Sequence, residues 1–145
     1  MRSNPYQAYV EDEIMTADPV KLVQMLYRGA LEAVRDARAK LAMADIKGRS
    51  AAVTKAVEIL GELSSSLDHE RGGELSANLA ALYDFAQRRL LAGNQEQADQ
   101  PLAEAERVLQ TLGEAWIGLE GVSDATAKLG RPAAQSERVP LSCAY

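Results

Sequence analysis

The sequence predicts an all-α protein: an antiparallel, up-down four-helix bundle with an N-terminal arm and a disordered C-terminal tail. Apolar residues recur at steps of three and four, the spacing that places side chains on one face of an α-helix. One such stripe is Val53, Ala56, Leu60, Leu63 and Leu67. Another is Leu102, Ala105, Leu109, Leu112, Trp116 and Leu119. Short connections between helices of similar length indicate antiparallel neighbours, so these stripes are interpreted as bundle core.

The first helix is expected to begin at Asp18-Pro19, because aspartate can cap free backbone N–H groups and proline suits the first helical position. Its stripe is Val23, Leu26, Ala30, Val34, Ala37 and Leu41. It should end near residues 45–48, with Gly48 as the stop. Ser50 is the expected N-cap of the second helix, which runs to about Asp68.

Two adjacent glycines, Gly72 and Gly73, predict a break, since glycine is costly inside a helix and cheap in a turn. The third helix carries Leu75, Leu79, Leu82, Ala86 and Leu90. Gly93-Asn94 is expected to close it with a left-handed cap. The fourth helix should start within residues 95–101 and end near Leu119. We therefore divide the chain into an arm (residues 1–17), a bundle (18–120) and a disordered tail (121–145), because the periodicity stops after Glu120.

Composition narrows the function classes. The chain has 145 residues, enough for one domain with one core, and a formal net charge of −5. Nucleic-acid binding is not expected, because it needs a clustered basic face. No run approaches the roughly 20 apolar residues that span a bilayer, so no membrane insertion is expected. The single cysteine, Cys143, allows no disulfide within the chain, and a cytoplasmic location is expected.

The sequence offers no catalytic, metal or cofactor site. Metal centres in four-helix bundles draw on several histidines, and this chain has one. No glycine-rich phosphate loop is present, and Cys143 lacks a partner base. The alternative function is histidine phosphotransfer through His69. That residue is flanked by Asp68 and Glu70, which would repel a phosphoryl group, so a surface histidine at a helix end is the preferred interpretation.

Three groups of residues together resemble a known family. They are Asn4-Pro5-Tyr6, Thr16-Ala17-Asp18-Pro19 and the run from Lys21 to Tyr27 with Gly29; Leu67 to Leu75 with Asn78-Leu79 and Leu82-Tyr83-Asp84; and Arg89 to Asn94 with Ala115-Trp116. In this order and spacing they resemble the flagellar secretion chaperone family FliS, over about residues 4 to 119.

That resemblance implies a non-enzymatic chaperone. Its client would be the C-terminal segment of flagellin, which is disordered in the monomer and is kept from premature polymerisation. The implied further partners are the cytoplasmic domain of the export gate and other flagellar assembly factors. An adaptor that regulates assembly through a different partner would share the fold.

A client helix needs an apolar groove, which a bundle can offer between helices. We expect the third helix to turn Leu75, Leu79 and Leu82 inward, with Tyr83 and Leu91 off that face. The candidate client-binding residues are Tyr6, Tyr9, Ile14, Leu22, Tyr27, Val57, Leu75, Leu79, Leu82 and Tyr83. Those in the helices are equally compatible with ordinary core. The arm residues among them either cover the groove until a client displaces them or complete the core permanently.

Overall fold

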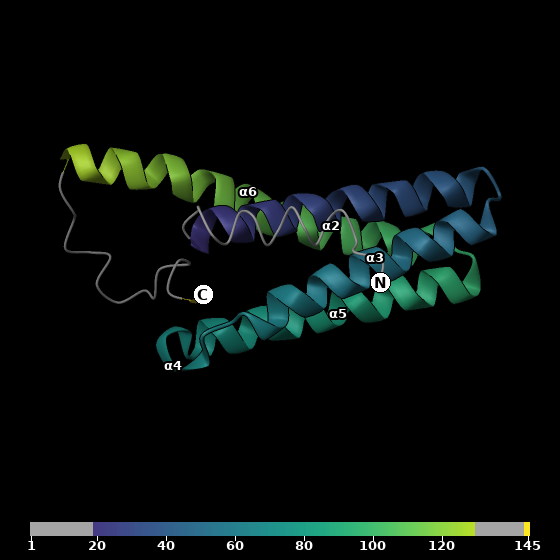
Figure 1. The fold of residues 1–145 in the computed structure, drawn as a ribbon, viewed down its shortest axis with the longest axis horizontal. Coiled ribbons are helices and arrows are strands. Elements are labelled where there is room, and N and C mark those ends of the chain that lie inside the picture. The colour runs from purple at the N-terminus through teal and green to yellow at the C-terminus, as the bar shows by residue number, and fades with distance from the viewer. Residues whose placement is uncertain (1–18, 130–143) are drawn as a thin grey trace, which may run out of the picture.

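A computed structural model describes the backbone of residues 19–129 and 144–145, and the side chains of residues 19–116 and 144–145. All regular structure in this part of the chain is helical (Figure 1): α2 (Pro19–Ala42), α3 (Ile46–Ser65), α4 (His69–Gly72), α5 (Glu74–Glu96) and α6 (Asp99–Leu129). The predicted all-α class is confirmed. The arm and the capping role expected of Asp18 lie outside the described residues.

The four long helices form a bundle in which each packs mainly against two others. Helix α2 packs against α3 and α6, and α5 packs against the same two helices. Figure 1 shows α2 beside α6 in one layer and α3 beside α5 in the other. Consecutive long helices reverse direction at short connections, and the one-turn helix α4 lies between α3 and α5. This arrangement agrees with the predicted up-down bundle.

The predicted apolar stripes form the core. All five residues of the stripe predicted for the second helix are buried, although Leu67 lies just beyond the end of α3. In α2 only Leu41 of the predicted six remains partly exposed. In α6, Leu102, Ala105, Leu109 and Trp116 are buried, while Leu112 is partly buried against them. Each fully buried leucine contributes about 1.5–3 kcal/mol of transfer free energy, so the stripes supply the main driving force for assembly.

The turn between α2 and α3 lies earlier than predicted. Helix α2 ends at Ala42, Ala44 adopts a left-handed φ of 59°, and Asp45 caps α3. The Asp45 carboxylate accepts a hydrogen bond of 2.9 Å from the backbone N–H of Gly48. Gly48 therefore lies in the first turn of α3 and is not a stop; a Cβ there would lie 2.4 Å from Asp45 Oδ2. Ser50 is a residue of the helix interior, so its prediction as N-cap is wrong.

The chain reverses again around α4. Helix α3 ends at Ser65, before the predicted end at Asp68. Asp68 instead caps α4, its carboxylate accepting a hydrogen bond of 2.9 Å from the Arg71 N–H. The break predicted at the glycine pair is confirmed: Gly73 has a positive φ of 50° and separates α4 from α5.

Helix α5 continues past its predicted cap. Gly93 and Asn94 are helical. Gln97 caps the helix in the left-handed conformation, and its backbone N–H donates a hydrogen bond to the Gly93 carbonyl. Gly93 is needed for packing, since a Cβ there would lie 2.7 Å from Leu102 Cδ2. The Asn94 side chain accepts a hydrogen bond of 2.7 Å from Arg49 Nε. Both residues thus serve contacts between helices, which sequence spacing did not show.

The predicted end of the fourth helix is also wrong. Helix α6 continues to Leu129 rather than ending near Leu119. The sequence contains no proline between Pro101 and Pro132, so the residue type that breaks a helix most strongly is absent from this stretch. Residues 130–143 lie outside the described part of the chain. Ala144 and Tyr145 pack against the bundle, so the expectation of a disordered tail fails for them as well.

Candidate functional site

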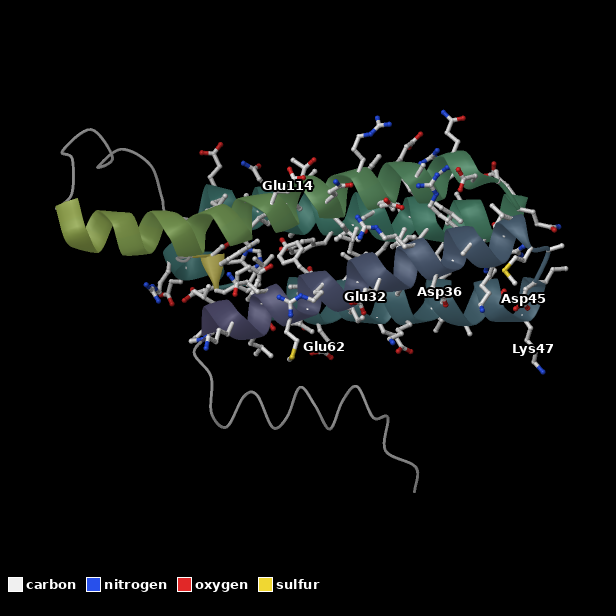
Figure 2. The ribbon with its side chains drawn as sticks, turned by 90° about the horizontal axis from the view of Figure 1, so that it is seen from above. Glu32, Asp36, Asp45, Lys47, Glu62 and Glu114 are labelled. Carbon is white, nitrogen blue, oxygen red and sulfur yellow. The ribbon has the colours of Figure 1, made fainter. Side chains whose placement is uncertain are left out.

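A small pocket of about 160 Å³ lies between α2 and α6, and we call it the groove. It is lined by Gln24, Tyr27, Arg28, Leu31, Leu109, Gln110, Gly113, Glu114 and Trp116. Figure 2 shows the two helices side by side, with Glu32 and Asp36 on α2 and Glu114 on α6. Gly113 leaves the α6 wall without a side chain, and a Cβ built there would meet nothing within 4 Å among the residues that the structure describes. The groove is therefore open at this point.

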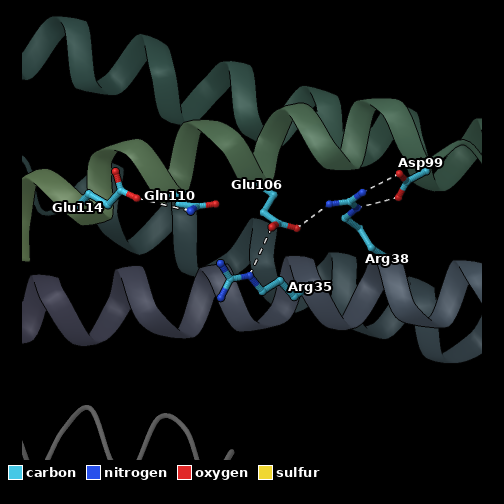
Figure 3. Close-up of polar contacts among 6 residues, drawn as sticks. All are labelled: Arg35, Arg38, Asp99, Glu106, Gln110 and Glu114. Atoms are coloured by element: carbon cyan, nitrogen blue, oxygen red, sulfur yellow. Dashed lines mark hydrogen bonds and ion pairs between the residues drawn. The ribbon is translucent and has the colours of Figure 1, made fainter.

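The floor of the groove is aromatic and buried, whereas its edges are polar. Tyr27 is 3% exposed and Trp116 is 1% exposed, and their rings lie 6.2 Å apart. Gln24 bridges the helices by donating its amide N–H to the Trp116 carbonyl at 3.1 Å. On α6, Gln110 and Glu114 are joined by a hydrogen bond of 3.5 Å (Figure 3). An apolar floor with a polar rim is the arrangement that receives an amphipathic helix.

Ion pairs close the remainder of the α2–α6 seam. The Arg38 guanidinium binds both carboxylate oxygens of Asp99, at 2.7 and 2.8 Å, and also Glu106 at 2.9 Å (Figure 3). Arg35 adds a longer contact of 3.4 Å to Glu106. The guanidinium of Arg38 holds the pKa of Asp99 below its usual value by hydrogen bonding. The seam is thus ionic toward the start of α6 and apolar where the groove lies.

Three tyrosine hydroxyls form a buried chain beneath the groove. The hydroxyl of Tyr83 lies between those of Tyr27 and Tyr145, and short hydrogen bonds join all three. Burial raises the pKa of Tyr27 and Tyr83 well above the usual value of a phenol, and it does the same for Tyr145. The three groups are therefore neutral phenols at physiological pH. Their role here is to join α2, α5 and the last residue of the chain.

The orientation of α5 differs from the prediction. Tyr83 is fully buried, whereas Leu82 is 38% exposed, so the expected inward and outward roles of these neighbours are reversed. The reason is the hydroxyl chain, which draws Tyr83 toward the interior. Phe85 is 37% exposed and lies three residues from Leu82 on the same helix face. With partly buried Leu75 they form an outer apolar stripe on α5, which we call the α5 stripe.

The structure brings together only some of the predicted site residues. Tyr27 lines the groove and is bonded to Tyr83, and Leu79 is buried core. Leu22 and Val57 are partly buried against the core and do not line the groove. Leu75 and Leu82 belong to the α5 stripe. The arm candidates, Tyr6, Tyr9 and Ile14, lie outside the described residues.

Sequence reasoning missed several groove residues. Leu31 and Gly113 line the groove, but nothing in their spacing separates them from core or surface positions. Trp116 belongs to the predicted core stripe, and it is both core and groove floor. Ala144 and Tyr145 gave no periodic signal, because they reach the bundle from a separate part of the chain.

The described residues hold no cluster of three or more histidine, cysteine, aspartate or glutamate side chains that could bind a metal. His69 is exposed and is the first residue of the one-turn helix α4, so it does not lie at the C-terminal end of a helix as expected. Cys143 lies outside the described residues. Among the described helices, none is long and apolar enough to cross a membrane.

The described residues define an all-α bundle with a groove between α2 and α6. The family described as flagellar protein FliS matches residues 2–122. The flagellar secretion chaperone FliS of Salmonella typhimurium is 40% identical over 111 residues, covering 76% of this chain and 82% of that protein. Flagellar secretion chaperone FliSB of Pseudomonas aeruginosa is 34% identical, covering 78% and 90%. FliS of Bacillus subtilis is 36% identical, covering 78% and 84%. The chain belongs to the FliS family of flagellar secretion chaperones.

Proposed function

We propose that this protein is a cytoplasmic export chaperone that binds the disordered C-terminal segment of flagellin. By holding that segment it prevents premature polymerisation and presents the client to the cytoplasmic domain of the export gate. Family membership supports the chaperone role, and the α2–α6 groove is the observation that supports helix binding. No catalytic step, metal or cofactor enters this function.

The groove is proposed as the first client surface. A client helix laid along it would place apolar side chains over Tyr27, Leu31 and Leu109, while its polar side chains meet the rim residues. The client backbone becomes ordered on binding and loses conformational entropy. The free energy gained from the apolar contacts must therefore be larger than this entropy cost. A rigid floor helps, because a preformed groove spends less free energy on its own ordering.

The α5 stripe is proposed as a second surface for the same client. Leu82, Phe85 and Leu75 are apolar, lie on one helix face and are only partly covered by the bundle. A client segment longer than one helix could contact both surfaces. Leu22 and Val57 would add apolar area at the helix edges.

The N-terminal arm is proposed to compete with the client. Tyr6, Tyr9 and Ile14 are apolar enough to cover a groove in the free protein. A net competition of about 1.4 kcal/mol would weaken client binding tenfold. Removal of residues 2–14 should then tighten binding, and the alternative, an arm that completes the core, predicts loss of stability without tighter binding. Other flagellar assembly factors would act on the same arm or groove.

The decisive experiment is calorimetric titration of a flagellin C-terminal peptide into Gly113→Leu and Thr111→Leu variants. Gly113→Leu fills the open side of the groove, and the space around Gly113 accepts a side chain without disturbing the bundle. Thr111 is exposed on the same helix and does not line the groove, so Thr111→Leu is the matched control. We expect at least about tenfold weaker binding for Gly113→Leu alone. Equal affinity of the two variants would exclude the groove, and absence of binding by the unmodified chain would refute the flagellin proposal itself.

A further inference from the structure

The last two residues of the chain occupy a small socket at the α4 end of the bundle. We define the tail socket by Asp68, Gly72, Ser76, Tyr83 and Trp116. Figure 1 shows this end of the chain lying between the α2–α6 layer and the α3–α5 layer. The Ala144 carbonyl accepts a hydrogen bond of 2.6 Å from the backbone N–H of Asp68, and Ala144 is fully buried.

The socket is shaped to accept a backbone and a small side chain. A Cβ on Gly72 would lie 3.0 Å from the Ala144 Cα and 1.9 Å from Ser76 Oγ, so only glycine permits this approach. The buried Ser76 hydroxyl donates to the Asp68 carbonyl at 2.9 Å and also lies 3.4 Å from the Ala144 carbonyl. The backbone N–H of Asp68 is thus the main donor to the occupant's carbonyl, with Ser76 Oγ close beside it, and neither group selects the occupant's side chain.

The next position of the occupant is selected by an aromatic pocket. The Tyr145 ring meets Trp116 edge-on at a centroid distance of 5.6 Å, a geometry favoured between aromatic rings. Its hydroxyl is hydrogen-bonded to that of Tyr83. Main-chain hydrogen bonds for affinity and a side-chain pocket for specificity are the usual features of a site that binds a short linear peptide.

We propose that the tail socket is a peptide-binding site for a small residue followed by tyrosine, and that Ala144 and Tyr145 occupy it in cis. Among the described residues of the tail, Ala144 and Tyr145 make the contacts with the socket, so the same dipeptide on a separate chain satisfies the same donor and the same pocket. The site is distinct from the client groove, although Trp116 contributes to both. The inference does not depend on flagellin being the client of the groove.

The test uses the full-length chain with Tyr145→Ala and a synthetic peptide matching residues 136–145. Tyr145→Ala weakens the cis occupant and leaves the socket residues intact. Trp116 is the only tryptophan of the chain, so its fluorescence reports directly on the ring that contacts Tyr145. We expect the peptide to change the emission of Tyr145→Ala saturably and to leave the unmodified chain unaffected, because its own tail competes.

Two further peptides test specificity. A peptide ending in alanine in place of tyrosine should bind at least about tenfold more weakly. A peptide ending in phenylalanine should bind with intermediate affinity, because it keeps the ring contact and loses the hydrogen bond to Tyr83. Circular dichroism checks that the variant remains folded.

Three results would overturn the proposal. The first is that the folded Tyr145→Ala variant fails to bind the peptide. The second is that the unmodified chain binds the peptide equally well, because the peptide then binds outside the socket. Unfolding of Tyr145→Ala is the third, since an occupant that the bundle needs in order to fold is not exchangeable.

Discussion

Gly93 in α5 and Gly113 in α6 are both helical, yet their surroundings predict opposite effects of the same substitution. A Cβ at Gly93 would lie 2.7 Å from Leu102 Cδ2, 2.8 Å from Leu102 Cγ and 3.1 Å from the Ala98 carbonyl oxygen. Leu102 is fully buried and has no room to withdraw. A Cβ at Gly113 would meet no described atom within 4 Å.

These contacts set the expected magnitudes. Alanine is favoured over glycine in a helix by about 0.5–1 kcal/mol, so Gly113→Ala should raise the free energy of unfolding by that amount. Gly93→Ala gains the same propensity but overpacks the core, at a cost of about 1–3 kcal/mol. We therefore expect Gly93→Ala to lower the free energy of unfolding by roughly 1–2 kcal/mol.

Urea unfolding followed by circular dichroism measures both variants, and an unchanged m-value confirms that only stability has changed. Leu102→Ala supplies the control, since it removes the Cγ and Cδ2 atoms that Gly93→Ala would meet. In that background Gly93→Ala should lose most of its cost, a coupling that a double-mutant cycle detects. Stabilisation by Gly93→Ala, or an equal cost with and without the Leu102 side chain, would refute the reasoning.

Three other substitutions test the cap, the seam and the hydroxyl chain. Asp45→Ala should cost about 0.5–2 kcal/mol in urea unfolding through loss of the α3 cap, while exposed Lys47→Ala changes little. Arg38→Ala should cost no more than about 1 kcal/mol, because the pair is partly exposed. Since the pKa of Asp99 is lowered in the folded state, the stabilisation exists above the unfolded pKa near 3.9 and is lost on acidification, so the Arg38→Ala effect should shrink below about pH 4. Tyr83→Phe should cost about 1–3 kcal/mol by leaving buried hydroxyls without their partner. The raised tyrosine pKa values keep the folded state neutral while the unfolded state ionises above about pH 10, so alkaline loss of stability should be smaller in Tyr83→Phe.

The core was predictable from sequence because helical periodicity is a local property. Val53, Leu60 and Leu63 recur at helical spacing, and all three are buried. The choice between adjacent apolar residues was not predictable in this way. Leu82 and Tyr83 both fit an apolar face, and the inward position goes to Tyr83 through hydrogen bonds with residues far away in sequence.

Helix ends were less predictable than helix faces because several residues are chemically suitable caps. Asp45 and Ser50 can both accept backbone N–H bonds, and the left-handed turn at Ala44 places Asp45 at the start of α3. Gly93 is a residue type that often ends a helix, but here it lies within α5 and leaves room for the Leu102 side chain. The groove and the tail socket could not be predicted either, because residues from different helices form them and a local sequence pattern does not show which of these residues meet.

The α2–α6 seam shows how one helix pair can provide both stability and a binding surface. Toward the start of α6, Arg38 bridges to Asp99 and Glu106 and holds the helices together. Toward Gly113, no side chain of the described part of the chain lies within 4 Å of a Cβ built on that glycine, and the groove lies over Tyr27 and Trp116.

The floor of that groove is held from below by the hydroxyl chain. Tyr27 is bonded to Tyr83, and Trp116 is packed against Tyr145, so neither ring is free to collapse into the opening. A groove whose floor is fixed in the free protein loses little conformational entropy when a helix binds. The structure thus favours a preformed site, and occupancy of the tail socket should alter the groove through Trp116, the ring that both share.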